Sequence, residues 1–247
     1  MTVVATSALA QPGPGEPAPP AEIDQGVVDD ALSPGAFLAP TALTEPAGTI
    51  SASVGGFTDT SFDSKALSHV SVAYAATNQI SLSATLELPG QIAGLTLGTL
   101  SAKAQMYRAG RVRVALQGNL LFATESGNSS EAVLVGGAGT LCLDDACNSY
   151  VTGYAGFGFE HSSGSGVPVL LSGAAAVQVV PHLKLLAELV SGFSTSDVSG
   201  VGNGALLFYG VRATDKNVGV NLGAVTTLGV GNSSTALLAT ATVRFKP

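Results

Sequence analysis

The sequence has no tryptophan, few charges and no long hydrophobic run. Only 11% of its 247 residues are charged, whereas 46% are hydrophobic and the mean hydropathy is +0.40. A membrane helix needs about 18 or more consecutive apolar residues, and the best candidate, residues 167–180, is interrupted by Ser172 and Gln178. Because only helices and closed β-barrels satisfy their backbone hydrogen bonds in lipid, a hydrophobic chain without a helical span predicts a transmembrane β-barrel.

Basic residues are missing from the first 45 positions, whose six acidic residues are Glu16, Glu22, Asp24, Asp29, Asp30 and Glu45. The other eleven acidic residues (17 − 6) nearly balance the ten basic ones, so the net charge of −7 belongs to the N-terminal tail. The chain has no basic cluster of the kind that binds nucleic acid, and this class of function is excluded.

The N-terminus resembles the end of a secretory signal peptide. Residues 3–10 are small and apolar, and Ala8-Leu9-Ala10 before Gln11 fits the cleavage rule, although a basic start is missing. We expect residues 1–10 to be a signal-peptide remnant, unless this likeness is chance. The Pro-rich residues 11–47 are expected to form a disordered periplasmic linker. Alternatively, residues 31–47 form a partial plug anchored by Phe37 and Leu38.

From Gly48 onward, apolar and polar residues alternate with a period of two, which is the pattern of strands with one buried face. In residues 99–107, one face is expected to hold Leu100, Ala102, Ala104 and Met106, and the other Thr99, Ser101, Lys103, Gln105 and Tyr107. Residues 111–120, 217–224 and 237–245 alternate in the same way. One face is apolar, and the other carries the charges.

The pattern predicts about twelve antiparallel strands, with ten as the alternative: 48–57, 67–76, 79–88, 95–108, 111–123, 131–142, 148–160, 168–180, 183–193, 205–213, 217–228 and 235–245. Short and long connections alternate, as in outer-membrane barrels, and an even number of strands places both termini on the short-turn, periplasmic side. A soluble sandwich would alternate similarly, with its apolar face inside. The apolar face of this chain consists largely of Ala, Val and Leu with few aromatic residues, which is little material for a core of this size. We therefore expect an all-β, up-and-down outer-membrane barrel over residues 48–247.

The two cysteines, Cys142 and Cys147, enclose four residues in a predicted short turn. Two thiols alone do not complete a tetrahedral metal site. In an exported protein this spacing favours a disulfide that closes the turn.

A family resemblance rests on residues 37–43 (FLAPTAL) before Gly48, on residues 71–82, and on the later stretches 167–189 and 204–224. These segments resemble a group of uncharacterised, porin-like outer-membrane barrel proteins of Gram-negative bacteria, over most of residues 37–245. The resemblance implies a fold and a location in the bacterial outer membrane. Phe245 resembles the aromatic residue that ends the last strand and is read by the barrel-assembly machinery, although Lys246 and Pro247 follow it here.

The alternation places a set of charged residues on the inward face: Glu87, Lys103, Arg111, Arg113, Glu160, Lys184, Glu188, Arg212 and Arg244. A charge facing hydrocarbon at the bilayer midplane costs roughly 2–4 kcal/mol, so these side chains line a wet channel or pair with one another. A channel with this basic excess would favour small anionic solutes. A closed barrel would be filled by ion pairs, such as Glu188 with Arg212.

Three functions are therefore considered: a passive channel for small solutes, a structural or surface-interaction barrel with a closed lumen, and a membrane-embedded lipid hydrolase. The hydrolase would need His69 as its base, because His161 begins a loop and His182 lies in a turn. No nucleophile elbow, zinc motif or phosphate loop occurs in the sequence, so we expect neither enzyme activity nor a cofactor. The expected partners are outer-membrane lipid, the barrel-assembly machinery and small solutes.

Overall fold

The structure is a computed structural model and describes residues 40–59, 67–89, 95–125, 128–160, 167–194, 205–215, 217–228 and 235–245. None of these residues forms a helix that could cross a membrane. The regular structure in this part consists of twelve strands: β1 (Ile50–Asp59), β2 (Leu67–Ala75), β3 (Ile80–Pro89), β4 (Leu95–Ala109), β5 (Val112–Glu125), β6 (Asn128–Cys142), β7 (Tyr150–Glu160), β8 (Pro168–Val180), β9 (Leu183–Ser194), β10 (Ala205–Asp215), β11 (Val218–Leu228) and β12 (Thr235–Phe245).

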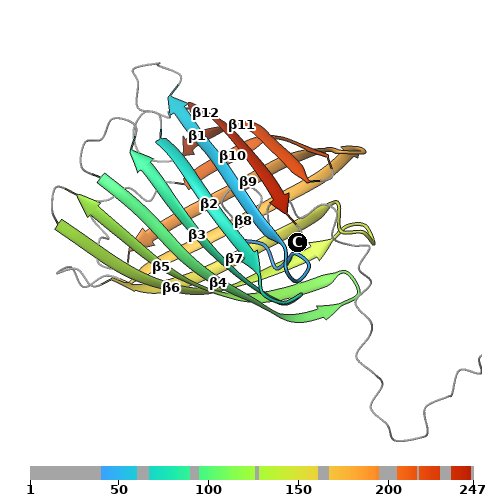
Figure 1. The fold of residues 1–247 in the computed structure, drawn as a ribbon, viewed down its shortest axis with the longest axis horizontal. Coiled ribbons are helices and arrows are strands. Elements are labelled where there is room, and N and C mark those ends of the chain that lie inside the picture. The colour runs from blue at the N-terminus through green and yellow to red at the C-terminus, as the bar shows by residue number, and fades with distance from the viewer. Residues whose placement is uncertain are drawn as a thin grey trace, which may run out of the picture.

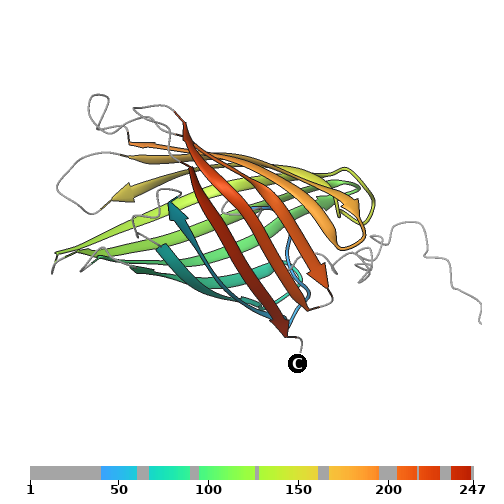
Figure 2. The same cartoon turned by 90° about the horizontal axis from the view of Figure 1, so that it is seen from above.

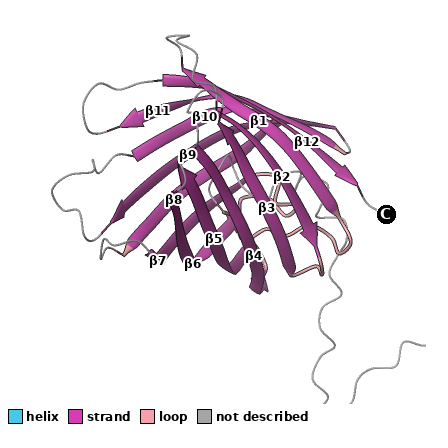
Figure 3. Cartoon of the chain, turned by 60° about the vertical axis from the view of Figure 1, so that its left-hand side comes forward, coloured by secondary structure: helices cyan, strands magenta, loops and turns pink. Residues whose placement is uncertain are grey.

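The strands form one closed, antiparallel barrel (Figure 1). Each strand pairs with its neighbours in sequence, and β1 pairs with β12 from Ile50↔Phe245 to Asp59↔Ala236, so the sheet has no free edge. Viewed from above, the strands are strongly tilted around the barrel (Figure 2). In Figure 3, which is coloured by secondary structure, the wall of the barrel consists of strands. The predictions of twelve antiparallel strands and an up-and-down barrel are confirmed.

The two faces of the wall differ as the alternation predicts. On β4 and β5, Leu100 and Leu116 point outward and are about half exposed, whereas Lys103 and Arg113 point inward and are buried. The same division continues around the barrel, so large apolar side chains cover its outer surface. A closed wall with an apolar exterior meets both requirements of a lipid bilayer, satisfied backbone groups and a hydrophobic surface.

Tyr107 differs from its predicted inward orientation. The pairing of β4 with β5 shifts between Gln105 and Tyr107, so that Met106 is the extra residue of a β-bulge. Met106 and Tyr107 are therefore both exposed, at 64% and 53%. The inserted residue breaks the period of two, and the sequence pattern does not reveal it.

The connection between β5 and β6 is also shorter than the predicted loop over 124–130. Glu125 pairs with Asn128, and both strands extend beyond the predicted ends at 123 and 131. The backbone ladder continues here through Ser129 and Ser130, where the sequence does not alternate between apolar and polar residues. The expectation that short and long connections alternate is therefore wrong at this hairpin.

The glycine-rich stretch of β6 makes room for a large inward side chain. A Cβ atom at Gly136 would lie 2.4 Å from the Tyr154 hydroxyl, and one at Gly156 would lie 2.5 Å from it. Tyr154 can therefore lie across the inner surface of β6 and β7, where it packs against Leu134 and Ala138.

Candidate functional site

The buried basic residues gather in the half of the lumen nearest the short turns. Arg113 and Lys184 follow the first residues of β5 and β9, and Arg244 precedes the last residue of β12. Arg212 lies three residues before the end of β10, and Lys103 lies six before the end of β4. Among the described residues, the buried acids are Glu45 and Glu188. The described interior of this half therefore has an excess of positive charge.

Polar contacts hold these cations in the wall. The Arg212 Nε–H donates to Asn221 Oδ1 at 2.7 Å, and Asn221 in turn donates to Thr240 Oγ1 at 2.6 Å. Lys184 lies beside Arg212 in the β9–β10 pairing, and its ammonium is 5.9 Å from the centre of the Tyr150 ring. A cation over an aromatic face is attracted by the ring quadrupole. Glu188 lies four residues after Lys184 on the same face of β9, with Leu186 between them. It is aligned with Phe208 of β10.

Arg111 is placed differently from the other predicted lumen residues. It lies in the turn before β5 and forms an ion pair with Asp145 at 2.8 Å, and both side chains are largely exposed. Its Nη1–H also donates to the Leu143 carbonyl at 3.2 Å. Arg111 therefore joins two short turns at the rim of the barrel. Glu87 and Glu160 belong to β3 and β7, but their side chains lie outside the described part of the structure.

Residues 40–49, called here the lumen segment, lie against the inner wall before β1 begins. The Ala42 N–H donates to Thr140 Oγ1 on β6 at 2.9 Å. From β4, Gln105 donates to the Ala42 carbonyl at 2.7 Å, and the Lys103 ammonium donates to the carbonyls of Thr41 and Leu43. At its other end, Ala47 N–H donates to Asn78 Oδ1 at 2.8 Å. The segment is thus bound through its backbone to several strands.

Apolar contacts hold the same segment on its other side. Ala42 packs against Ala115, Leu134, Ala138 and Tyr154. Leu43 packs against the disulfide and its neighbours Tyr150, Ala176 and Leu186. Because these residues belong to strands β5 to β9, the segment reaches across the short-turn half of the lumen. The predicted anchors Phe37 and Leu38 lie outside the described residues; Ala42 and Leu43 make the anchoring contacts observed.

Glu45 brings a carboxylate into this basic interior. It is 4% exposed, and its Oε2 accepts a hydrogen bond from Ser51 Oγ at 3.3 Å. Burial raises the pKa of Glu45 above its ordinary value, and this effect exceeds the opposing attraction of Arg244, Ser51 and Lys103. In the sequence, Glu45 is the last of the six acidic residues of the N-terminal tail, and no local pattern indicates that it enters the barrel.

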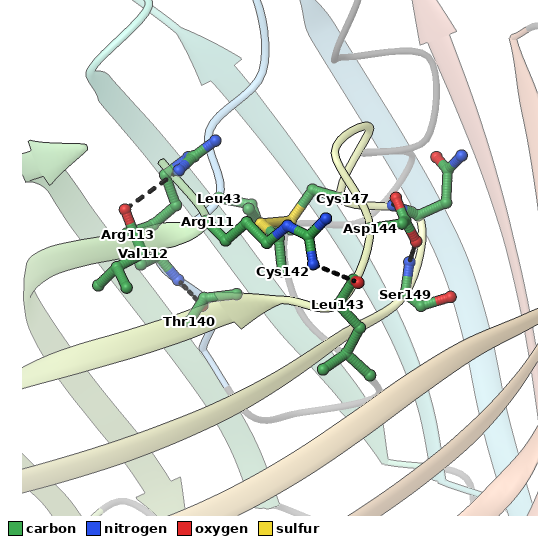
Figure 4. The surroundings of a disulfide bond; sticks show 12 residues. Leu43, Arg111, Val112, Arg113, Thr140, Cys142, Leu143, Asp144, Cys147 and Ser149 are labelled. Atoms are coloured by element: carbon green, nitrogen blue, oxygen red, sulfur yellow. Dashed lines mark hydrogen bonds between the residues drawn. A yellow bond between two sulfur atoms is a disulfide. The ribbon is translucent and has the colours of Figure 1, made fainter. Parts of the chain in front are cut away.

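The predicted disulfide between Cys142 and Cys147 is present, in the turn between β6 and β7 (Figure 4). The Asp144 carboxylate accepts the N–H groups of Asn148 and Ser149 at 2.9 and 2.6 Å, which closes the turn from within. Both cysteines are buried, and Leu43 lies beside their bond (Figure 4). The disulfide therefore holds the turn in the position where it contacts the lumen segment.

Comparison with known proteins gives structural neighbours only. No protein-family model and no curated protein matches the chain. Among solved structures, a KdgM porin in complex with disordered oligogalacturonate aligns with a TM-score of 0.61 at 13% identity, over 79% of this chain and 99% of the porin. The COG4313 outer membrane channel from Pseudomonas putida F1 aligns with a TM-score of 0.59 at 12% identity, over 83% and 98%.

The chain has the fold of an outer-membrane porin. The neighbours and the apolar outer wall agree with the bacterial outer membrane as its location. At this level of identity the likeness concerns the fold, so the function has to be argued from the lumen. His69, the proposed base of a hydrolase, is half-buried on the inward face of β2 and is aligned with Glu87 of β3.

We predict that replacing both Cys142 and Cys147 with serine lowers the free energy of unfolding by about 2 kcal/mol, the loop-closure value for so short a loop. Urea unfolding in detergent micelles measures this change. The matched control is Arg111→Gln at the same rim, which removes an exposed ion pair and should cost less than about 1 kcal/mol. A serine variant as stable as the wild type would show that the disulfide does not stabilise the turn.

Proposed function

We propose that this protein is a passive outer-membrane channel for small solutes that favours anions and is partly plugged at its periplasmic end by the lumen segment. The observation that carries the proposal is the excess of buried cations: Lys103, Arg113, Lys184, Arg212 and Arg244, against Glu45 and Glu188 among the described residues. A lumen lined by one sign of charge attracts the opposite sign, and low-dielectric walls strengthen the effect.

The structural neighbours support a channel. One is described as a porin in complex with oligogalacturonate, which is a polyanion, and the other as an outer-membrane channel. Solutes of the same charge would be attracted by the basic interior of this barrel. The lumen segment supports closure, because its backbone is hydrogen-bonded to β4 and β6 before Leu43 and to β2, through Gly48 N–H and the Ala75 carbonyl, after it.

A structural or surface-interaction barrel is the second candidate. The nearly complete burial of Lys184, Glu188 and Arg212, each at most 2% exposed, favours this alternative. Buried charges that are packed and hydrogen-bonded leave little room for solutes. The two candidates differ in whether ions cross the barrel.

Current recordings on the purified protein in planar bilayers test the proposed preference. We expect the wild type to show a reversal potential in a KCl gradient that indicates chloride preference. Lys184→Gln should shift this potential toward potassium, because it removes a cation from the lumen. Arg111→Gln, which removes a cation from the exposed rim, should shift it much less. Equal shifts in the two variants would contradict a basic lumen as the source of selectivity.

Deleting residues 11–47 tests closure by the lumen segment. The deletion removes the anchors Ala42 and Leu43 but keeps all twelve strands, so we expect a larger conductance or longer openings than in the wild type. An unchanged conductance would rule out a plug formed by this segment. If neither protein shows conductance steps at any voltage, the channel itself is excluded and the closed barrel is favoured.

A further inference from the structure

Glu45 is an intramolecular carboxylate that lies in a basic, buried site of the lumen. Ser51, which donates to it, is aligned with Arg244 across the β1–β12 pair. Arg244 of β12 and Lys103 of β4 both attract Glu45 electrostatically. The site therefore combines one hydroxyl donor with two cations, which is a donor set suited to a carboxylate.

The contact between Glu45 and this site is loose. The Ser51 hydroxyl approaches Oε2 at 3.3 Å, longer than the usual range for a hydroxyl bound to a carboxylate. No hydrogen-bond donor among the described residues reaches Oε1, although this atom is buried. A buried carboxylate oxygen without a donor is unfavourable. The carboxylate of a separate solute is not fixed by the chain, so it could place both of its oxygens within reach of donors in this site.

Lys103 links the carboxylate site to the position of the segment. Its ammonium donates to the backbone carbonyls of Thr41 and Leu43, and it also attracts Glu45. An anion that binds Lys103 would therefore weaken both contacts at once. Gly48, where φ is +82° and nothing lies within 4 Å of the Cβ position, is the place at which a displaced segment would pivot.

We propose that Lys103, Arg244 and Ser51 form a carboxylate-binding site that Glu45 occupies at rest, and that a carboxylate solute displaces Glu45 and loosens the lumen segment. This inference rests on the proposed function and names its solute class. Charge balance makes the exchange selective: if Glu45 left without a replacement, two buried cations would lose an anion. A neutral solute cannot provide that replacement.

Amide hydrogen exchange, followed by mass spectrometry on the full chain in detergent, tests the proposal with acetate as the probe and chloride at equal ionic strength as the reference. Ala42, Ala47, Gly48 and Thr49 donate backbone hydrogen bonds that report on the segment. In the wild type we expect these amides to exchange about tenfold faster in acetate, as when one charge-assisted contact of a locally opening unit is lost. In Glu45→Gln they should exchange fast in both salts.

Asp145→Asn is the matched control, because it removes a carboxylate from the same end of the barrel but outside the lumen. It should respond to acetate like the wild type. Protected amides of β8 and β9 show in each variant that the barrel is folded. Equal exchange in the two salts for the wild type, or an acetate effect that persists in Glu45→Gln, would overturn the proposal.

The outcome is separable from that of the bilayer recordings. A barrel that conducts anions but shows no acetate effect would keep the proposed channel and lose this site. An acetate effect in a barrel that never conducts would keep the carboxylate site and remove the channel.

Discussion

A charged side chain on a membrane-spanning strand has to point into the barrel, because water or a partner is available only there. This constraint accounts for the period of two, the apolar outer wall and the closure of β1 on β12. It also creates a second problem inside. Cations enclosed by a narrow wall still need anions or polar groups around them.

The lumen segment answers part of that need. Lys103 finds acceptors in the segment's carbonyls, and Glu45 supplies a carboxylate near Arg244. The segment is in turn supported by the disulfide turn through Leu43. The proposed closure of the lumen and the neutralisation of its charges thus depend on the same ten residues. In the proposed exchange, the position of the lumen segment therefore depends on which carboxylate occupies the basic site.

The strands were predictable from sequence because the outward residues of a barrel are apolar without exception over long stretches, as in 237–245. Even residues 183–190, which also have helix-forming composition, form the strand β9 between its neighbours. Tyr107 was not predictable, since a one-residue bulge leaves no mark in composition.

The site was only partly predictable. Lys103, Arg113, Lys184, Glu188, Arg212 and Arg244 could be assigned to the interior by parity, and all are buried. Arg111 has the same parity but lies in a turn, where alternation no longer decides orientation. Ala42 and Leu43 depend on contacts with residues some 60 to 100 positions away, and Glu45 is attracted by Lys103 and Arg244 of two other strands. No local pattern encodes these contacts.

Fluorescence quenching by lipids with brominated acyl chains tests the central claim most directly, because the chain has no tryptophan of its own. Tyr209→Trp places a single indole on the outer face, and Tyr154→Trp places one on the buried inner face. The account predicts strong quenching of the indole at position 209 and little at position 154. Equally weak quenching at both positions would show that the apolar outer face does not contact lipid, and would contradict the account.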